Sequence, residues 1–162
     1  MQRIIVIGCP GSGKTTFASK LRDRLGYPLF YLDSIWHRAD RTHISRDEFD
    51  ERLSEILPGE RWIIDGNYSR TLERRLLACD TVFLFDLPTD VCLSGAEARV
   101  GKERPDMPWV ENKLDPQFKA VIEEFKTEKL PDIYALIERC CGGKAVYVFK
   151  SREEAQSFLC GL

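Results

Sequence analysis

Several patterns are missing from this sequence, and each absence excludes a class of function. There is no run of about 18 apolar residues that could span a bilayer, and no signal peptide. The cysteines form no Cys-x-x-Cys pair, and neither histidine lies at zinc-ligand spacing. The six cysteines are Cys9, Cys79, Cys92, Cys140, Cys141 and Cys160. We therefore expect a cytoplasmic protein without a membrane partner, whose cysteines are reduced and mostly buried.

The sequence also has no excess of basic residues. Its 24 Lys and Arg residues are outnumbered by 26 Asp and Glu residues, which gives a formal net charge of −2. A domain that binds duplex DNA would carry a basic surface, so a nucleic-acid partner is not expected. With 162 residues and 43% hydrophobic content, the chain is long enough for one domain with a sizeable core. No feature of the sequence indicates the oligomeric state.

A glycine-rich segment near the N-terminus is the most informative feature that is present. It follows the β-branched run Arg3–Ile7 and precedes Lys14–Leu25, whose apolar spacing predicts an amphipathic helix. A strand, a glycine loop and a helix in this order are the context that a phosphate-binding loop requires. The predicted nucleotide-binding residues are Gly8, Cys9, Pro10, Gly11, Ser12, Gly13, Lys14, Thr15 and Thr16.

The chemistry of this loop follows from its residue types. Glycines let successive backbone N–H groups approach a phosphate at the positive end of a helix dipole. Lys14 supplies a charge for the β- and γ-phosphates, the Thr15 hydroxyl is placed to bind Mg²⁺, and Thr16 can donate to an α-phosphate oxygen. The alternative is a glycine-rich turn that binds nothing, which the complete motif in this context disfavours. We predict that the protein binds ATP and Mg²⁺.

Strands and helices alternate along the chain. Four further strands are expected at Tyr27–Leu32, Arg61–Ile64, Thr81–Phe85 and Ala145–Phe149. Helices are expected at 45–57 and from Ser151, each with a Ser-x-x-Glu capping box, and also at about 70–79 and 90–100. This alternation predicts an α/β fold with a parallel sheet covered by helices on both faces.

The connection from Leu87 to Lys144 is longer than one crossover helix needs. We expect an irregular segment with three prolines, then two helices broken near Pro131. The segment 99–115 includes Gly101 and three cations, Arg99, Lys102 and Arg104, which favours a mobile lid that closes over a triphosphate. A solvated surface loop is the alternative.

Three predicted strands end in an aspartate, at Asp33, Asp65 and Asp86. Ligands of open α/β sheets bind at these carboxyl ends. Asp65 is the expected partner of Mg²⁺, whereas Asp33 would accept a proton from the phosphate acceptor or hold a metal-bound water. Each of the three could instead be a turn or helix-capping residue, and we favour that interpretation for Asp86.

The acceptor would lie near Asp33, between two loops. Asn67, Tyr68 and Arg70 follow Asp65 and could contact the acceptor, although Arg70 could instead pair with acidic side chains. Trp36 could stack on a ring-bearing acceptor or belong to the core. His37 and His43, close to Trp36, are expected to be ordinary surface or capping residues.

Segments along nearly the whole chain match one family. They are Ile7–Thr15, Tyr31–Asp33 with Trp36, Trp62–Ser69, Phe85–Pro88, Arg104–Met107, Glu111, Asp115 with Phe118, and Lys150–Glu154. In these segments the chain resembles the adenylate-kinase-related proteins often named DNA topology modulation proteins. The resemblance implies a P-loop kinase fold with strand order 2-3-1-4-5 and a lid between the fourth and fifth strands. It also implies ATP and Mg²⁺ as cofactors and a phosphotransferase activity with an undefined acceptor.

Three functions are consistent with these patterns. The leading hypothesis is a small-molecule kinase in which Lys14, Arg99 and Arg104 stabilise the transferred charge and Asp33 acts as base or acceptor ligand. The alternatives are a nucleotide-gated regulatory protein and a nucleic-acid-associated ATPase.

Overall fold

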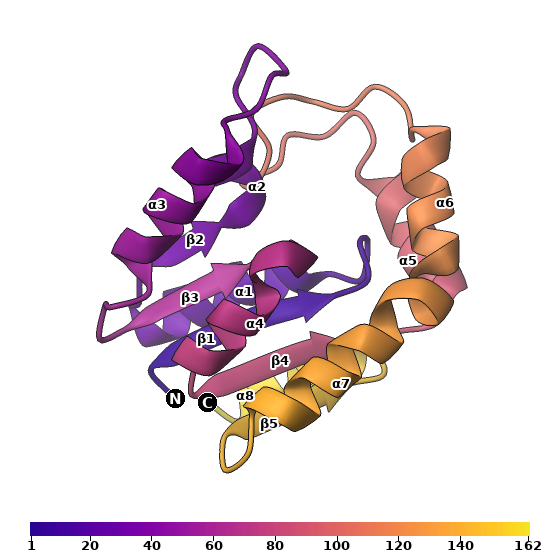
Figure 1. Cartoon of the computed structure of the whole chain (residues 1–162). Coiled ribbons are helices and arrows are strands. Elements are labelled where there is room, and N and C mark those ends of the chain that lie inside the picture. Colours follow the sequence, from indigo (N-terminus) through magenta and orange to yellow (C-terminus); the bar gives the residue numbers. More distant parts are fainter.

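Five parallel strands lie at the centre of the protein in a computed structural model that describes residues 1–162 (Figure 1). Their order in the sheet is β2-β3-β1-β4-β5. The strands are β1 (Arg3–Gly8), β2 (Leu29–Tyr31), β3 (Trp62–Asp65), β4 (Thr81–Phe85) and β5 (Ala145–Phe149). This is the predicted fold class and strand order. Because β1 is flanked by β3 and β4, the loop that follows it lies beside the carboxyl ends of both neighbours.

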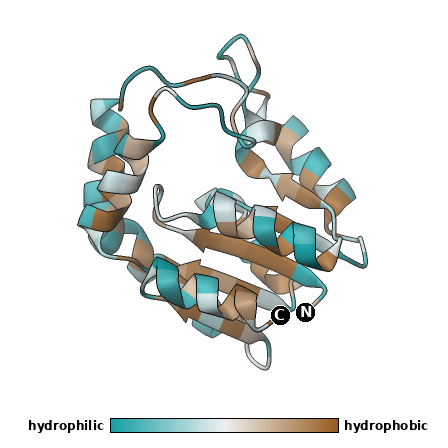
Figure 2. Cartoon of the chain, turned by 180° about the vertical axis from the view of Figure 1, so that it is seen from behind, coloured by the Kyte–Doolittle hydropathy of each residue, from teal (hydrophilic) through white to brown (hydrophobic).

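The three central strands form the core of the sheet. Ile4, Ile5, Val6 and Ile7 of β1 have no exposed surface, and every residue of β3 and β4 is buried. Figure 2 shows these strands as the continuous hydrophobic part of the molecule. A parallel strand covered on both faces needs apolar side chains on both, which explains why β1 reads as an unbroken apolar run.

Two pairs of helices cover the sheet, one pair on each face (Figure 1). On one face α1 (Lys14–Leu25) packs beside α8 (Arg152–Cys160), and on the other α4 (Ser69–Ala78) packs beside α7 (Leu130–Cys140). The two predicted capping boxes are confirmed. The Ser45 hydroxyl accepts the Glu48 N–H at the start of α3 (Arg46–Ile56), and Ser151 accepts the Glu154 N–H at the start of α8.

The second strand is shorter than the predicted range Tyr27–Leu32. β2 pairs only three residues with β3, and Leu32 begins a short helix, α2 (Leu32–Trp36). β2 is an edge strand, and its pairing stops where β3 itself stops, at Asp65. Asp33 then lies in the first turn of α2, where a carboxylate is favoured by the helix dipole. The sequence prediction was wrong in extending the strand through Leu32.

The long connection between β4 and β5 begins and ends with helices. It comprises α5 (Thr89–Ala98), a segment from Arg99 to Asp115 without helix or strand, α6 (Pro116–Glu124), the π-helical turn η1 (Phe125–Lys129) and α7. The predicted break near Pro131 does not occur. Pro131 lies in the first turn of α7, and the preceding turn widens so that the Leu130 N–H donates to Phe125 O. The helical path therefore continues past a residue that lacks an N–H.

Two further expectations concern the chain as a whole. All six cysteines are free, and only Cys160 is exposed, as predicted. No helix combines the length and the apolar character needed to cross a membrane.

Candidate active site

The loop between β1 and α1 has the conformation of a cradle for an anion. Gly8, Gly11 and Gly13 all have positive φ angles, of 137°, 80° and 104°. A Cβ on Gly8 would lie 2.3 Å from the carbonyl oxygen of Phe85, and one on Gly11 would lie 2.1 Å from that of Cys92. Both positions therefore require glycine for space as well as for φ.

The first turn of α1 is open to a ligand. No side chain caps the helix, so its leading N–H groups keep their hydrogen-bonding capacity. The Ser12 hydroxyl is fully buried and has no hydrogen-bond partner. The Lys14 ammonium folds over the loop and donates to Cys9 O at 3.1 Å. These groups border a cavity of about 660 Å³ that extends from the loop to Arg99, Arg104 and Arg152.

Asp65 lies at the end of β3 beside the loop. Its Oδ2 accepts the Thr15 hydroxyl at 2.7 Å, while Oδ1 is buried and has no partner. Burial raises the pKa of this carboxyl to about 6, and the nearby Lys14 charge opposes the rise. A carboxylate oxygen without a partner, next to a hydroxyl at the phosphate loop, is a donor set that suits Mg²⁺.

Asp33 comes to the same edge of the sheet. Its Oδ1 accepts the Tyr68 hydroxyl at 2.8 Å, and Oδ2 makes no hydrogen bond within the chain. Burial and the adjacent Asp33 charge raise the pKa of Tyr68, so the phenol stays protonated and donates. Asp65 also lies close enough to Asp33 for their charges to interact. The sequence prediction that these two strand ends form one polar site matches this arrangement.

The other predicted acceptor residues have different surroundings. The Asn67 amide is engaged with the phosphate loop, because Nδ2 donates to Gly8 O at 2.9 Å and Oδ1 accepts the Gly8 N–H at 3.0 Å. Arg70 forms a two-point ion pair with Asp50 at 2.7 Å. Trp36 stacks on His43 and, together with Tyr68 and Arg70, lines a second cavity of about 200 Å³. Trp36 thus has core contacts and also borders a cavity.

The predicted lid cations differ in how far they are neutralised. Arg104 is held by two carboxylates: Asp106, through Nε at 3.1 Å and through Nη2, and Glu111, through Nη1 at 3.1 Å. Two carboxylates of the same segment therefore neutralise Arg104. Arg99 has no carboxylate partner, and its buried Nε makes no hydrogen bond. Burial lowers the pKa of Arg99, whose guanidinium lies 5.2 Å from the centre of the Phe118 ring.

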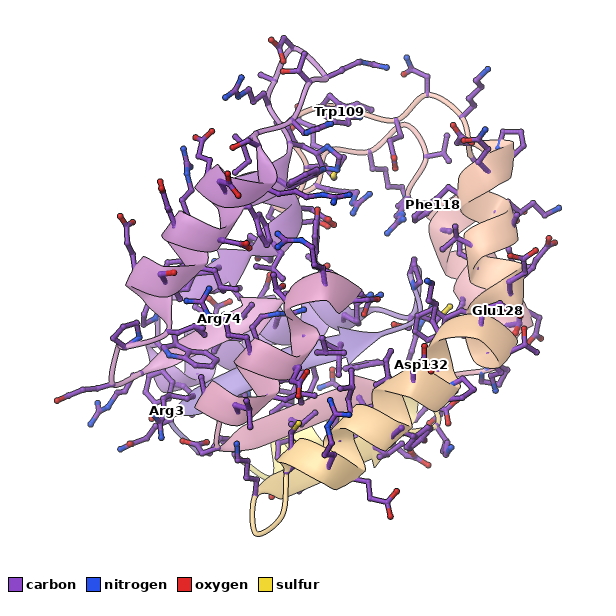
Figure 3. The ribbon with its side chains drawn as sticks, viewed as in Figure 1. Arg3, Arg74, Trp109, Phe118, Glu128 and Asp132 are labelled. Atoms are coloured by element: carbon purple, nitrogen blue, oxygen red, sulfur yellow. The ribbon has the colours of Figure 1, made fainter.

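The segment 99–115 crosses from α5 to the Asp33 side of the site. Ser34 Oγ in α2 donates to Asp106 O at 2.9 Å, and the Trp109 ring contacts His37 at 5.1 Å between centroids. The Arg41 guanidinium lies over the Trp109 ring, 5.7 Å from its centroid. Figure 3 shows Trp109 at this end of the segment and Phe118 on α6 at the other. Whether the segment moves as a lid stays a prediction.

Three residues near the site were not recognised from the sequence. Arg152 in α8 donates to Gly11 O and Ser12 O and so helps to fix the backbone of the phosphate loop. Asp106 is buried against Arg104, and Arg75 is buried below the connection from β3 to α4. Arg75 did leave a signal, since it occupies the apolar face of α4 that Leu72 and Leu76 define. Asp86, by contrast, pairs with Lys150, Lys126 and Tyr134, in agreement with a structural role.

Sequence comparison with known proteins finds limited similarity. No protein-family model matches the chain. Adenylate kinase from Thermotoga neapolitana is 26% identical over 88 residues, which are 53% of this chain and 39% of that protein. The chain thus matches well under half the length of this relative, so the likeness points to adenylate kinases without showing membership of their family.

Solved structures match over nearly the full chain. Shikimate kinase from Bacteroides thetaiotaomicron aligns with a TM-score of 0.63 and 18% identity, covering 99% of this chain and 95% of that one. Shikimate kinase from Acinetobacter baumannii, in complex with shikimate, aligns with a TM-score of 0.57 and 17% identity. This alignment covers 98% of this chain and 91% of that one. At these identities the likeness shows that the chain has the α/β fold of P-loop kinases. Neither comparison bears on the DNA topology modulation group, which stays a prediction.

Proposed function

We propose that this protein is an ATP-dependent kinase that transfers the γ-phosphoryl group of Mg·ATP to a hydroxyl group of a small molecule. One observation carries the proposal. The phosphate loop, the Thr15–Asp65 pair and the Asp33 carboxylate meet at one edge of the sheet. Two catalytic carboxylates beside a phosphate cradle suit transfer to an acceptor, whereas binding of a nucleotide alone requires only the loop.

The loop would bind the phosphates of ATP. The open N-terminus of α1, the Ser12 hydroxyl and the Lys14 ammonium are the donors available to them, and Thr16 follows at the third helical position. Asp65 and Thr15 would hold Mg²⁺, which supplies charge neutralisation between the β- and γ-phosphates. The buried, partnerless Oδ1 of Asp65 supports this assignment.

Asp33 would receive the proton of the acceptor. In the transfer, the acceptor oxygen forms a bond to the γ-phosphorus as the bond to the bridging β,γ-oxygen breaks, and ADP leaves with that electron pair. The acceptor's proton passes to Asp33 Oδ2, because Tyr68 occupies Oδ1. Asp33 and Tyr68 then define where the hydroxyl lies, and Trp36 with its cavity borders the rest of the acceptor.

The lid arginines would contribute unequally to the transfer. Arg99 faces the main cavity without a carboxylate partner, so its charge is available to the transferred phosphoryl group. Arg104 must first exchange Asp106 or Glu111 for phosphate. We therefore assign the larger stabilisation to Arg99.

A screen of phosphate acceptors tests the proposal. Purified protein is incubated with Mg·ATP and single candidates from three groups, nucleosides, nucleotides and hydroxylated acids or sugars, and ADP release is followed with each. We expect one group to raise ADP release above the rate with water alone, with phosphorylated acceptor found by mass spectrometry. Lys14→Ala and Asp33→Asn should lose that increment. Acceptor-independent hydrolysis that is unaffected by Asp33→Asn would refute the kinase proposal.

A further inference from the structure

The short connector Asp65–Tyr68, between β3 and α4, touches three separate parts of the site. Asp65 accepts the Thr15 hydroxyl of the phosphate loop at 2.7 Å. The Asn67 amide accepts the backbone N–H of Gly8 and donates to the Gly8 carbonyl, at the entry to that loop. Tyr68 donates to Asp33, the proposed proton acceptor. These few residues therefore relate the position of the nucleotide to that of the acceptor.

The backbone of this connector has unusual φ angles. Tyr68 has a φ of 36°, one of only two positive values among the non-glycine residues, and Gly66 has a φ of 138°. A Cβ on Gly66 would lie 2.9 Å from the Leu32 Cβ, so the connector also packs tightly against the start of α2. Unusual backbone angles of this kind persist only where surrounding groups hold them.

Arg75 is the group that holds the connector. It has no exposed surface, and Nη1 donates to Gly66 O at 2.8 Å. Nη2 donates to Tyr68 O at 3.1 Å and also to Asn67 O. No carboxylate forms an ion pair with it within the chain. Its guanidinium thus satisfies three consecutive carbonyls of one connector.

Packing alone does not explain a charge at this position. Burial lowers the pKa of Arg75 to about 9, which shows that the folded environment opposes the charge. An apolar side chain of similar length would fill the same space on the apolar face of α4 without that cost. A guanidinium, however, holds its N–H donors in a wide, fixed fork, which suits carbonyls spread along three consecutive residues better than the single nitrogen of an ammonium does.

We propose that Arg75 is a positioning residue, which acts through the connector to set where Asp65 and Asp33 lie relative to the phosphate loop. The proposal rests on the kinase function proposed above. Arg75 touches neither nucleotide nor acceptor. Its loss should therefore lower the rate of phosphoryl transfer more than it weakens nucleotide binding, for which the open N-terminus of α1 and Lys14 are the proposed donors.

The substitution Arg75→Lys tests this inference, because it keeps the positive charge and replaces the fork with a single ammonium group. We expect kcat to fall about 10- to 100-fold, the usual effect of removing a partner of a site residue, while KM for ATP changes less than about threefold. Tyr68→Phe, which removes only the contact with Asp33, should likewise lower kcat and leave KM for ATP nearly unchanged. The double variant should be no slower than the slower single variant, because both act on Asp33.

Two control variants separate positioning from general loss of stability. Leu76→Ala removes a fully buried side chain from the next position of the same helix and should lower Tm without touching the connector. Arg139→Lys alters an exposed arginine on α7 that pairs with Glu73. Rates are compared at a temperature where every variant is fully folded. If Leu76→Ala reduces kcat as much as Arg75→Lys does, Arg75 is merely structural and the proposal is overturned.

Amide hydrogen exchange provides a readout that does not depend on transfer activity. In Arg75→Lys we expect faster exchange at Gly66, Asn67 and Tyr68 and at the start of α2, with β1 and β4 unchanged, whereas Leu76→Ala should leave the connector as in the wild type. Uniform acceleration throughout α4 and the sheet would overturn the inference. If the wild type transfers phosphate to no acceptor, the proposed function fails, and the exchange pattern still decides whether Arg75 holds the connector. Should Arg75→Lys not fold, Arg75→Gln replaces it in the same comparisons.

Discussion

Asp65→Asn should make the folded protein more stable at neutral pH while it destroys the proposed metal site. The carboxyl of Asp65 is buried, and its pKa is raised from the ordinary value of 3.8 to about 6, chiefly by burial. At 1.36 kcal/mol for each unit of pKa, this difference means that the ionised carboxylate lowers the free energy of unfolding by about 3 kcal/mol relative to the protonated form. Asparagine avoids the cost of ionisation and can still accept the Thr15 hydroxyl.

The sign of the pH dependence follows from this raised pKa. Because the folded protein binds the proton more tightly than the unfolded chain, the contribution of Asp65 to stability is fully present below about pH 4 and is lost as the pH rises through about 6. The stability difference between Asp65→Asn and the wild type should accordingly be small near pH 3.5. It should grow between about pH 4 and 6 and level at about 3 kcal/mol above pH 7.

Urea unfolding at a series of pH values from about 3.5 to 8 measures this difference without added metal. Asp80→Asn is the control, because hydrogen bonds lower the pKa of Asp80 despite its partial burial and so reverse the sign of the effect. Added Mg²⁺ with nucleotide should stabilise the wild type and not Asp65→Asn, as ligand binding to the folded state requires. An Asp65→Asn variant that is less stable than the wild type at pH 7.5, with unchanged unfolding slope, would refute the reasoning.

Three more predictions concern the nucleotide, the acceptor and the lid. Lys14→Ala should weaken Mg·ATP binding at least about tenfold with an unchanged Tm, because it removes a charge from an already formed loop; equal affinities in calorimetry would contradict this. Asp33→Asn should lower kcat by about 100-fold or more and leave KM for ATP nearly unchanged, and a steady-state assay showing near-normal turnover would exclude Asp33 as the base. Hydrogen exchange across Arg99–Asp115 should slow when a non-hydrolysable ATP analogue and acceptor bind. Trp109→Ala, which removes the contacts with His37 and Arg41, should speed exchange in the same segment without nucleotide; no change in either experiment would leave it a surface loop.

The sequence by itself determined the elements that depend on neighbouring residues. The strands at 81–85 and 145–149 and the helix Lys14–Leu25 have the predicted bounds, because hydrophobic periodicity, glycines and capping serines act within a few positions of the chain. The phosphate loop was predictable for the same reason. The meeting of Asp33 and Asp65 followed from one further rule, that the carboxyl ends of parallel strands share an edge of the sheet.

Only the tertiary structure decided which polar groups form hydrogen bonds with one another. Asn67 pairs with Gly8 across 59 positions of the sequence and Tyr68 with Asp33 across 35, and neither separation leaves a periodic signal. Asn67 was expected at the acceptor, yet its amide is engaged with Gly8, and of the two alternatives for Arg70 the structure shows the pairing with an acidic side chain, Asp50. The place of Arg75 on the apolar face of α4 indicates burial, but its contacts were not predictable, because its partners are backbone carbonyls, which every residue possesses and no sequence pattern records. Such contacts arise when packed elements bring distant backbone together, and they become visible only in the folded chain.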